Sequence, residues 1–239
     1  ITIHQLTGAD ITEDAWDAFF AFYMETGSRK WGRPYLTRKF FSLIGESMSR
    51  DVLLVMANRS GRLRVLVVGG SLVAAIFNKT VPQAMRTLSA AQRPEIWHQT
   101  GRGQRDATER AYEKSAVTTI VAEFTDDMAA AYGWADVVIC RAGAMTIAEL
   151  CAAGVAAILV PYPSAVDDHQ TANARFPAQR DAAILVPQQD FSAAYLAETL
   201  QSLANNRDLL LKMANNARAC AVPDATETVA RLCMEVSHA

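Results

Sequence analysis

The hydrophobic and polar positions of the chain follow two different patterns, and the change between them falls near residue 60. From Leu63 onward, short apolar runs alternate with stretches in which apolar residues recur at helical spacing. Continuous apolar runs are typical of parallel strands buried on both faces, so the alternation indicates a doubly wound, Rossmann-like α/β sheet. The expected strands are 64–70, 94–99, 118–124, 135–141, 155–161 and 182–187. The expected helices are 74–90, 104–115, 126–134, 145–153 and 168–179, with a helical tail over 191–236.

The residues before this pattern are rich in aromatic side chains and predict a short α+β fragment. Thr12 precedes two acidic residues and apolar positions at helical spacing, which predicts a capped helix that ends near Gly27. A basic aromatic loop separates it from a second expected helix, for which Thr37 is the candidate N-cap. The sequence therefore predicts an N-terminal fragment over 1–62 and an α/β domain over 63–239.

One further element is expected in the N-terminal fragment. The apolar run that follows Asp51 predicts a strand leading into an Asn-Arg-Ser-Gly turn. Such a strand is expected to have a returning partner after the turn, but the chain enters the α/β pattern there instead.

Composition narrows the class of protein. The chain of 239 residues is 51% hydrophobic and 20% charged with a net charge of -2, which is typical of a soluble globular protein and offers no basic face for nucleic acid. Its four cysteines lack metal-ligand spacing and suit a reducing compartment. No apolar run approaches the roughly 20 residues of a transmembrane helix, and no secretion signal is visible. We therefore expect a cytoplasmic protein that is at most peripheral on the inner face of the cell membrane.

Polar, turn-forming or charged residues follow five successive predicted strands of the α/β domain. Ligands of such sheets bind beyond the carboxyl ends of the strands, so this clustering predicts a ligand site there. Gly69 and Gly70 end the first of these strands and, with Ser71, open the helix that follows; they could bind phosphate or form only a tight turn. The dinucleotide fingerprint G-x-G-x-x-G is missing.

The stretch "CRAGAMTIAEL", residues 140–150, places a charged residue on each side of a glycine turn between a strand and a helix. Thr146 and Glu149 have the spacing of a capping box, which would explain both residues structurally. The alternative interpretation is a nucleotide site. Asp167 and Asp168 could be taken as a metal pair, but they precede a helix, suit its positive end and lack nearby His or Glu partners.

Taken together, the stretches "LRVLVVGGS", "IWHQTG", "EFTDDMAAAYGWADVVICRAGAMTIAEL" and "VPYPSAVDDHQTANA" resemble the C-terminal domain of the MurG family of bacterial glycosyltransferases. The resemblance covers residues 63 to about 236. It implies one half of a GT-B fold, in which two Rossmann-like domains flank a cleft and the C-terminal one holds UDP-N-acetylglucosamine. It also implies transfer of N-acetylglucosamine, with inversion, to lipid I at the membrane surface, giving lipid II for peptidoglycan, with no metal or other cofactor.

The resemblance assigns roles to the residues after the strands. Glu149 would accept hydrogen bonds from the two ribose hydroxyls, and the turn of Gly143, Ala144, Met145 and Thr146 would lie near the diphosphate. The other expected donor contacts are Ser71 with Gly69 and Gly70 at the diphosphate, Phe124 and Thr125 around the uracil, and His169 and Gln170 on the sugar. Gln170 offers both a donor and an acceptor for sugar hydroxyls. His98 is likewise expected on the donor side.

Three features depart from the family pattern. Val73 stands where the family's phosphate loop has a glycine, and a β-branched residue adopts positive φ only at a cost. The family's acceptor-binding half and its general base have no match in the first 62 residues. That segment instead resembles part of the peptidoglycan biosynthesis/recognition proteins of the acyl-CoA N-acyltransferase-like type, as though two unrelated genes were joined.

Three functions remain open on these grounds. The first is the N-acetylglucosaminyltransferase that the resemblance implies, and the second is a sugar-nucleotide-binding module that transfers nothing. The third and weakest is an acyltransferase, whose remaining strands and acyl-CoA pyrophosphate loop are not visible in the sequence. Because the acceptor half is unmatched, we expect this chain to bind the donor without turning over lipid I.

Overall fold

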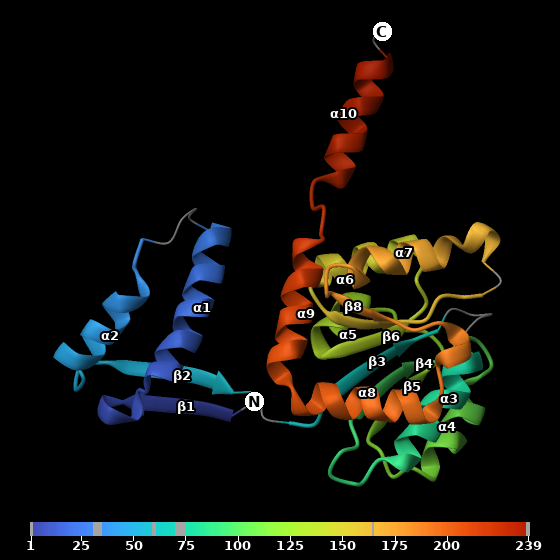
Figure 1. The fold of residues 1–239 in the computed structure, drawn as a ribbon, viewed down its shortest axis with the longest axis horizontal. Helices are drawn as coiled ribbons and strands as arrows, with labels where there is room; N and C mark the ends of the chain where they lie inside the picture. Colours follow the sequence, from blue (N-terminus) through green and yellow to red (C-terminus); the bar gives the residue numbers. More distant parts are fainter. Residues whose placement is uncertain (1, 31–34, 59–60, 70–74, 164, 238–239) are drawn as a thin grey trace. The chain divides into compact units, whose positions relative to one another are not determined.

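The structure is a computed structural model that describes residues 2–30, 35–58, 61–69, 75–163 and 165–237. The chain divides into two compact units, Ile1–Gly61 and Arg62–Ala239. Figure 1 shows the fold of each unit.

The first unit is a two-stranded antiparallel sheet with two helices (Figure 1). Strand β1 (Thr2–Thr7) pairs with β2 (Leu53–Asn58), and a short 3-10 turn, η1 (Gly8–Asp10), follows β1. The expected strand after Asp51 is confirmed as β2, and the chain after the turn enters the α/β pattern, as expected, at β3 (Arg64–Val68) of the other sheet. The partner of β2 is β1, at the other end of the unit. The sequence did not indicate β1 as a strand, because its polar residues resemble those of surface chain.

Helix α1 (Glu13–Lys30) continues past Gly27, where the sequence predicted its end. A glycine inside a helix costs only about 1 kcal/mol relative to alanine, so one glycine does not stop a helix that packs well. The predicted cap is confirmed, since the Thr12 hydroxyl accepts a hydrogen bond from the Ala15 N–H at 3.3 Å. Helix α2 (Arg38–Ser47) begins after Thr37, but the Thr37 side chain makes no capping hydrogen bond.

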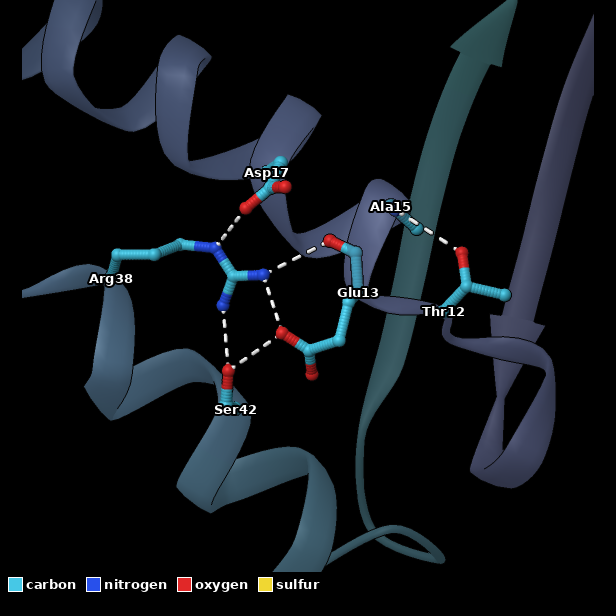
Figure 2. Close-up of polar contacts among 6 residues, drawn as sticks. All are labelled: Thr12, Glu13, Ala15, Asp17, Arg38 and Ser42. Carbon is cyan, nitrogen blue, oxygen red and sulfur yellow. Dashed lines mark hydrogen bonds and ion pairs between the residues drawn. The ribbon is translucent and has the colours of Figure 1, made fainter.

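A polar network joins the two helices (Figure 2). The Arg38 guanidinium donates to Asp17 Oδ1 at 2.5 Å, to Glu13 Oε2 at 2.7 Å and to Ser42 Oγ at 2.7 Å. The hydrogen bond to Arg38 lowers the pKa of the Glu13 carboxyl. Between the helices, the rings of Trp16 and Phe41 pack in a tilted arrangement with centroids 5.8 Å apart, so aromatic burial supplies the core of this unit.

The second unit is the expected α/β fold. Its strands run in the order β5-β4-β3-β6-β7-β8 and all of their pairings are parallel. The strands are β3 (Arg64–Val68), β4 (Glu95–Gln99), β5 (Thr119–Ala122), β6 (Val137–Cys140), β7 (Ala156–Leu159) and β8 (Ala183–Leu185). Each lies inside the run that predicted it, and β6 and β7 are buried at every residue, as expected of strands covered on both faces.

Helices cover both faces of this sheet (Figure 1). On one face a core forms under α3, α4, α8 and α9, and on the other a second core forms under α5, α6 and α7. Their bounds are α3 Ala75–Thr87, α4 Arg105–Glu113, α5 Met128–Trp134, α6 Ala144–Ala153, α7 His169–Ala178, α8 Ala193–Asn205 and α9 Arg207–Ala219. Short 3-10 turns precede α7 and α8, at η2 (Val166–Asp168) and η3 (Gln188–Asp190).

The last helix, α10 (Ala225–Ser237), differs from the others because it contributes to neither core. Its large apolar side chains are more than half exposed: Val229, Leu232, Met234 and Val236. Within the ranges that the structure describes, every helix is too short or too polar to cross a lipid bilayer.

Candidate functional site

The carboxyl ends of β3 and β6 define where a ligand would bind. From β3 the chain moves outward through β4 to β5, then returns to β6 on the other side of β3 and continues to β7 and β8. The last residues of the two central strands, Val68 and Cys140, are paired in register. Open α/β sheets bind ligands outside the strand ends where the order reverses in this way. The segments that leave this point begin at Gly69 and at Arg141.

The first turn of α6 presents unpaired main-chain N–H groups at the switch point. Gly143 is the N-cap residue, in an extended conformation, and no side chain caps the helix. The N–H groups of Ala144, Met145 and Thr146 therefore have no acceptor within the helix. Together with the positive end of the helix dipole they suit an anion such as a diphosphate. The Met145 side chain is 74% exposed and Ala144 is also exposed, so this part of the turn faces solvent.

Glu149 lies one turn further along α6 with its side chain exposed. Its Oε2 accepts a hydrogen bond from the Tyr132 hydroxyl of α5 at 2.9 Å. The capping-box interpretation of Thr146 and Glu149 is wrong, because Gly143 occupies the N-cap and Thr146 already lies in the first turn. A carboxylate has about four acceptor positions, so Glu149 keeps acceptors for a ligand after bonding Tyr132.

Arg141, the charged residue before the glycine turn, has a structural role. It is 8% exposed and donates to the main-chain oxygens of Val160 at 3.0 Å and Pro161 at 3.1 Å, and to Gln188 Oε1 at 2.7 Å. Its guanidinium also lies over two aromatic rings, and burial lowers its pKa. Arg141 thus ties the end of β6 to the segment that follows β7, which fixes the direction in which the turn leaves the sheet.

Helix α7 holds the same turn from the other side. Gln170 Oε1 accepts from the main-chain N–H groups of Ala142 at 3.3 Å and Tyr162 at 3.0 Å. Asn173, one turn later, donates to the Ala142 carbonyl at 3.0 Å. The expectation that Gln170 offers a sugar both a donor and an acceptor needs correction, because two main-chain N–H groups already use its oxygen. Its amide nitrogen is the group that can face a ligand.

Phe124 and Thr125 follow β5, the strand at one edge of the sheet. The Phe124 ring is 50% exposed, while the Thr125 hydroxyl is buried and has no hydrogen-bond partner among the described residues. Such a hydroxyl is costly unless a polar group meets it. Two residues later Asp127 caps α5 by accepting from the Ala130 N–H at 2.8 Å. Helix α5 in turn carries Tyr132, whose hydroxyl contacts Glu149 of α6.

The expected phosphate loop is only partly described. Gly69 is buried and exchanges hydrogen bonds with Gln99 of β4, donating from its N–H at 3.2 Å and accepting from the Gln99 amide at 3.4 Å. Gly70 and Ser71 lie outside the described residues, as does Val73. His169 is exposed at the first position of α7.

His98 was expected to contact the donor, and the structure shows otherwise. Its ring is fully buried on β4, with Nδ1 2.7 Å from the Tyr112 hydroxyl and Nε2 3.0 Å from Asn78 Oδ1. Burial lowers its pKa to about 3, so it stays neutral. The Asn78 amide also donates to the Thr100 carbonyl at 3.1 Å. His98 therefore supports α3 and the end of β4 from within and cannot reach a sugar nucleotide.

Asp168, the second residue of the acidic pair before α7, has a local structural role. Asp168 occupies the N-cap position of α7 with a positive φ, and its Oδ1 accepts from the Thr171 hydroxyl at 2.6 Å. Across the described ranges, no three His, Cys, Asp or Glu side chains gather as a metal ion would require.

Sequence reasoning missed Tyr132, Asn173 and Gln188, which orient the expected site residues. Tyr132 is the polar member of an otherwise apolar helix, and a buried tyrosine hydroxyl usually finds a partner, which was an available signal. Gln170 and Asn173 are three residues apart and so share a helix face, a second signal. Nothing local in the sequence indicates that Gln188, 47 residues away, meets Arg141.

Comparison with known families gives two matches along the chain. Residues 64–229 match the model of the glycosyltransferase family 28 C-terminal domain. Residues 1–76 match a model described as peptidoglycan biosynthesis/recognition, FemAB-like.

Curated relatives match more than three quarters of the chain. The UDP-N-acetylglucosamine--N-acetylmuramyl-(pentapeptide) pyrophosphoryl-undecaprenol N-acetylglucosamine transferase of Marinobacter nauticus is 54% identical over 183 residues, which cover 77% of this chain and 50% of the relative. The protein of the same name from Neisseria meningitidis is 55% identical over 79% of this chain and 54% of its own length. The chain thus spans about half the length of these relatives.

A solved structure agrees with these relatives. The crystal structure of Acinetobacter baumannii MurG superposes with a TM-score of 0.69 at 42% identity and covers 75% of this chain and 55% of the MurG chain.

Proposed function

The chain belongs to the family of the glycosyltransferase family 28 C-terminal domain, and on that premise we propose that residues 63–239 form a domain that holds the donor, UDP-N-acetylglucosamine. The observation that carries the proposal is the arrangement at the switch point. There the uncapped first turn of α6 and the exposed Glu149 carboxylate follow one another on a single helix. These two features complement a diphosphate and a ribose, which are adjacent groups of a nucleoside diphosphate.

The proposal gives each remaining group of the donor its contacts. The diphosphate meets the N–H groups of Ala144, Met145 and Thr146, and the ribose hydroxyls donate to Glu149. Phe124 stacks on or frames the uracil, whose polar edge supplies the buried Thr125 hydroxyl with a partner. The sugar receives hydrogen bonds from the Gln170 amide nitrogen and lies near His169, at the start of α7.

We propose that the reaction served by this site is the one named by the relatives, transfer of N-acetylglucosamine to a membrane-borne pyrophosphoryl-undecaprenol acceptor. An acceptor hydroxyl attacks the anomeric carbon, UDP leaves, and the configuration inverts. The residues of α6 that bind the diphosphate also stabilise the charge that develops on the departing UDP. We expect no cofactor beyond the donor.

A second candidate is a module that binds the donor and transfers nothing, and one specific observation favours it for this 239-residue chain. A peptidoglycan biosynthesis/recognition model matches residues 1–76, which include all of the chain that precedes the proposed donor domain. We propose 1–62 as an incomplete N-terminal fragment of the acyltransferase-like type. Positioning two substrates can supply roughly 7–11 kcal/mol of a barrier, and a donor domain by itself forgoes that contribution.

Transfer of radiolabelled N-acetylglucosamine from UDP to a lipid I analogue separates the two candidates. We expect the purified chain to show no turnover above background while still binding UDP. Turnover comparable to that of an intact relative would instead show that residues 1–62 contribute an acceptor site.

Calorimetric titration of UDP into the intact chain tests the donor site itself. Glu149→Ala should weaken binding about ten- to a hundred-fold, because losing a charged acceptor for buried hydroxyls costs on the order of 1.5–3 kcal/mol. Glu198→Ala removes an exposed carboxylate from α8 and serves as the matched control, with unchanged affinity expected. No detectable UDP binding by the unmodified chain would refute the assignment.

A further inference from the structure

The exposed Glu149 carboxylate is held by a buried tyrosine. The Tyr132 hydroxyl donates to Glu149 Oε2 at 2.9 Å, across the contact between α5 and α6. The two residues differ in exposure, since Tyr132 is 7% exposed while the Glu149 side chain is open to solvent. A buried phenol thus reaches outward to hold a carboxylate at the surface.

Tyr132 cannot easily move away from this position. Its ring packs in the core beneath α5 and α6, with Ile147 and Leu150 of α6 in the same cluster. Burial, and then the hydrogen bond to Glu149, raise the pKa of the Tyr132 hydroxyl far above its ordinary value. The hydroxyl therefore remains protonated and acts as a fixed donor.

The contact has a consequence for the geometry of the carboxylate. An exposed glutamate samples several rotamers, and ordering such a side chain on binding has a cost in affinity. Tyr132 occupies one position on Oε2 and so selects the rotamer before any ligand arrives. The remaining lone pairs of the carboxylate then face solvent, where two neighbouring hydroxyls can donate to them.

We propose that Tyr132 is a positioning residue that orients Glu149 for the 2′- and 3′-hydroxyls of the ribose and so sets the selectivity of the site for ribonucleotides over deoxynucleotides. The inference rests on the proposed donor function, because it assigns the ribose to Glu149. It assigns Tyr132 no contact with the nucleotide.

The experiment compares UDP with 2′,3′-dideoxy-UDP in calorimetric titrations of the intact chain. Tyr132→Phe should weaken UDP binding roughly 3- to 10-fold, the range expected when one side chain must be ordered on binding. It should leave affinity for the dideoxy nucleotide unchanged, because that ligand makes no use of Glu149. Tyr195→Phe, which removes a hydroxyl from α8, is the matched control and should change neither affinity.

A merely structural role predicts a different result. If Tyr132→Phe weakens both nucleotides equally, the residue supports the fold and the positioning role is overturned. Two isosteric replacements protect the test against poor folding of the phenylalanine variant. Tyr132→4-aminophenylalanine keeps a donor and should restore the preference for UDP, whereas Tyr132→4-methylphenylalanine fills the space without a donor and should not. Restoration by both would also overturn the proposal.

The same titrations distinguish failure of this inference from failure of the donor function. If Glu149→Ala leaves the ratio of UDP to dideoxy-UDP affinity unchanged, the ribose assignment itself is wrong. If Glu149→Ala abolishes the preference while Tyr132→Phe preserves it, the donor function stands and only the role of Tyr132 is refuted. In the Glu149→Ala background, Tyr132→Phe should have no further effect on UDP affinity.

Discussion

At the scale of single residues, the side chains around the switch point divide into those that face a ligand and those that hold them in place. Arg141 and His98 belong to the second group, although their charge and their chemistry make them attractive ligand contacts in the sequence. Both are buried, and their polar groups are hydrogen-bonded to other residues of the protein rather than open to a ligand. Glu149 is exposed and only partly engaged, which leaves it able to bind.

The buried His98 gives the second unit a stability that depends on pH. The pKa of His98 is about 3 in the folded state and 6.5 ordinarily. Between these pH values His98 is protonated in the unfolded chain but not in the folded chain. The free energy of unfolding is therefore fully supported above pH 6.5 and declines as pH falls from there toward 3. From pH 7 to pH 5 this residue alone should reduce it by about 2 kcal/mol.

Urea unfolding of the chain and of His98→Gln at both pH values measures this difference. The variant should be less stable at pH 7, since it disturbs the bonds to Asn78 and Tyr112, yet should lose less stability between pH 7 and pH 5. An identical loss in both proteins would mean that His98 is protonated in the folded state.

At the scale of elements, the strands and helices of the second unit could be predicted from local pattern. Short continuous apolar runs indicated the strands, and apolar residues at helical spacing indicated the helices. What the sequence could not show is how elements meet. The contact between Tyr132 and Glu149 joins two helices, and the oxygen of Gln170 is taken up by main-chain groups of two separate loops. Such contacts depend on tertiary packing, so the sequence indicated which strand ends carry polar groups but not which of those groups are free. The strand β1 was missed for a related reason, because only its pairing with β2 distinguishes it from surface chain.

The C-cap of α6 can be tested by its contribution to the stability of the second unit. Gly154 closes α6 with φ +66°, and a Cβ there would lie 3.2 Å from Arg218 Cβ of α9. Gly154→Ala should therefore destabilise the unit by about 1–2 kcal/mol, through backbone strain and crowding. Gly133→Ala is the matched control, because a Cβ there meets no atom within 4 Å, and it should leave the unit as stable or up to about 1 kcal/mol more stable. Thermal unfolding checks both; equal effects would contradict the left-handed cap.

At the scale of the whole molecule, the chain combines two compact units that match different family models. The first has an aromatic core of its own, and the second has two cores that flank its sheet. Leu63, 3% exposed, is the first residue of the second unit to enter a core. The family match and the candidate site both lie within this second unit.

Limited proteolysis should separate the two units. We expect cleavage between Asn58 and Leu63, where β2 has ended and the core of the second unit has not begun, and a stable fragment from about Leu63 onward. Mass spectrometry of the fragments identifies the site. Resistance of this segment, with amides of β1 and β2 protected as strongly as those of β3, would show that the two units form one cooperative core.

The central claim is that the second unit binds the donor at the ends of β3 and β6, and amide hydrogen exchange of the intact chain with and without UDP-N-acetylglucosamine tests it most directly. The account predicts slower exchange for Ala144, Met145 and Thr146 in the presence of the nucleotide, because its diphosphate accepts from these otherwise unpaired N–H groups. Over 123–127 it predicts a smaller slowing of exchange on nucleotide binding. Over 2–30 it predicts no change. Unchanged exchange in the first turn of α6 at a saturating donor concentration, or protection confined to the first unit, would contradict the claim.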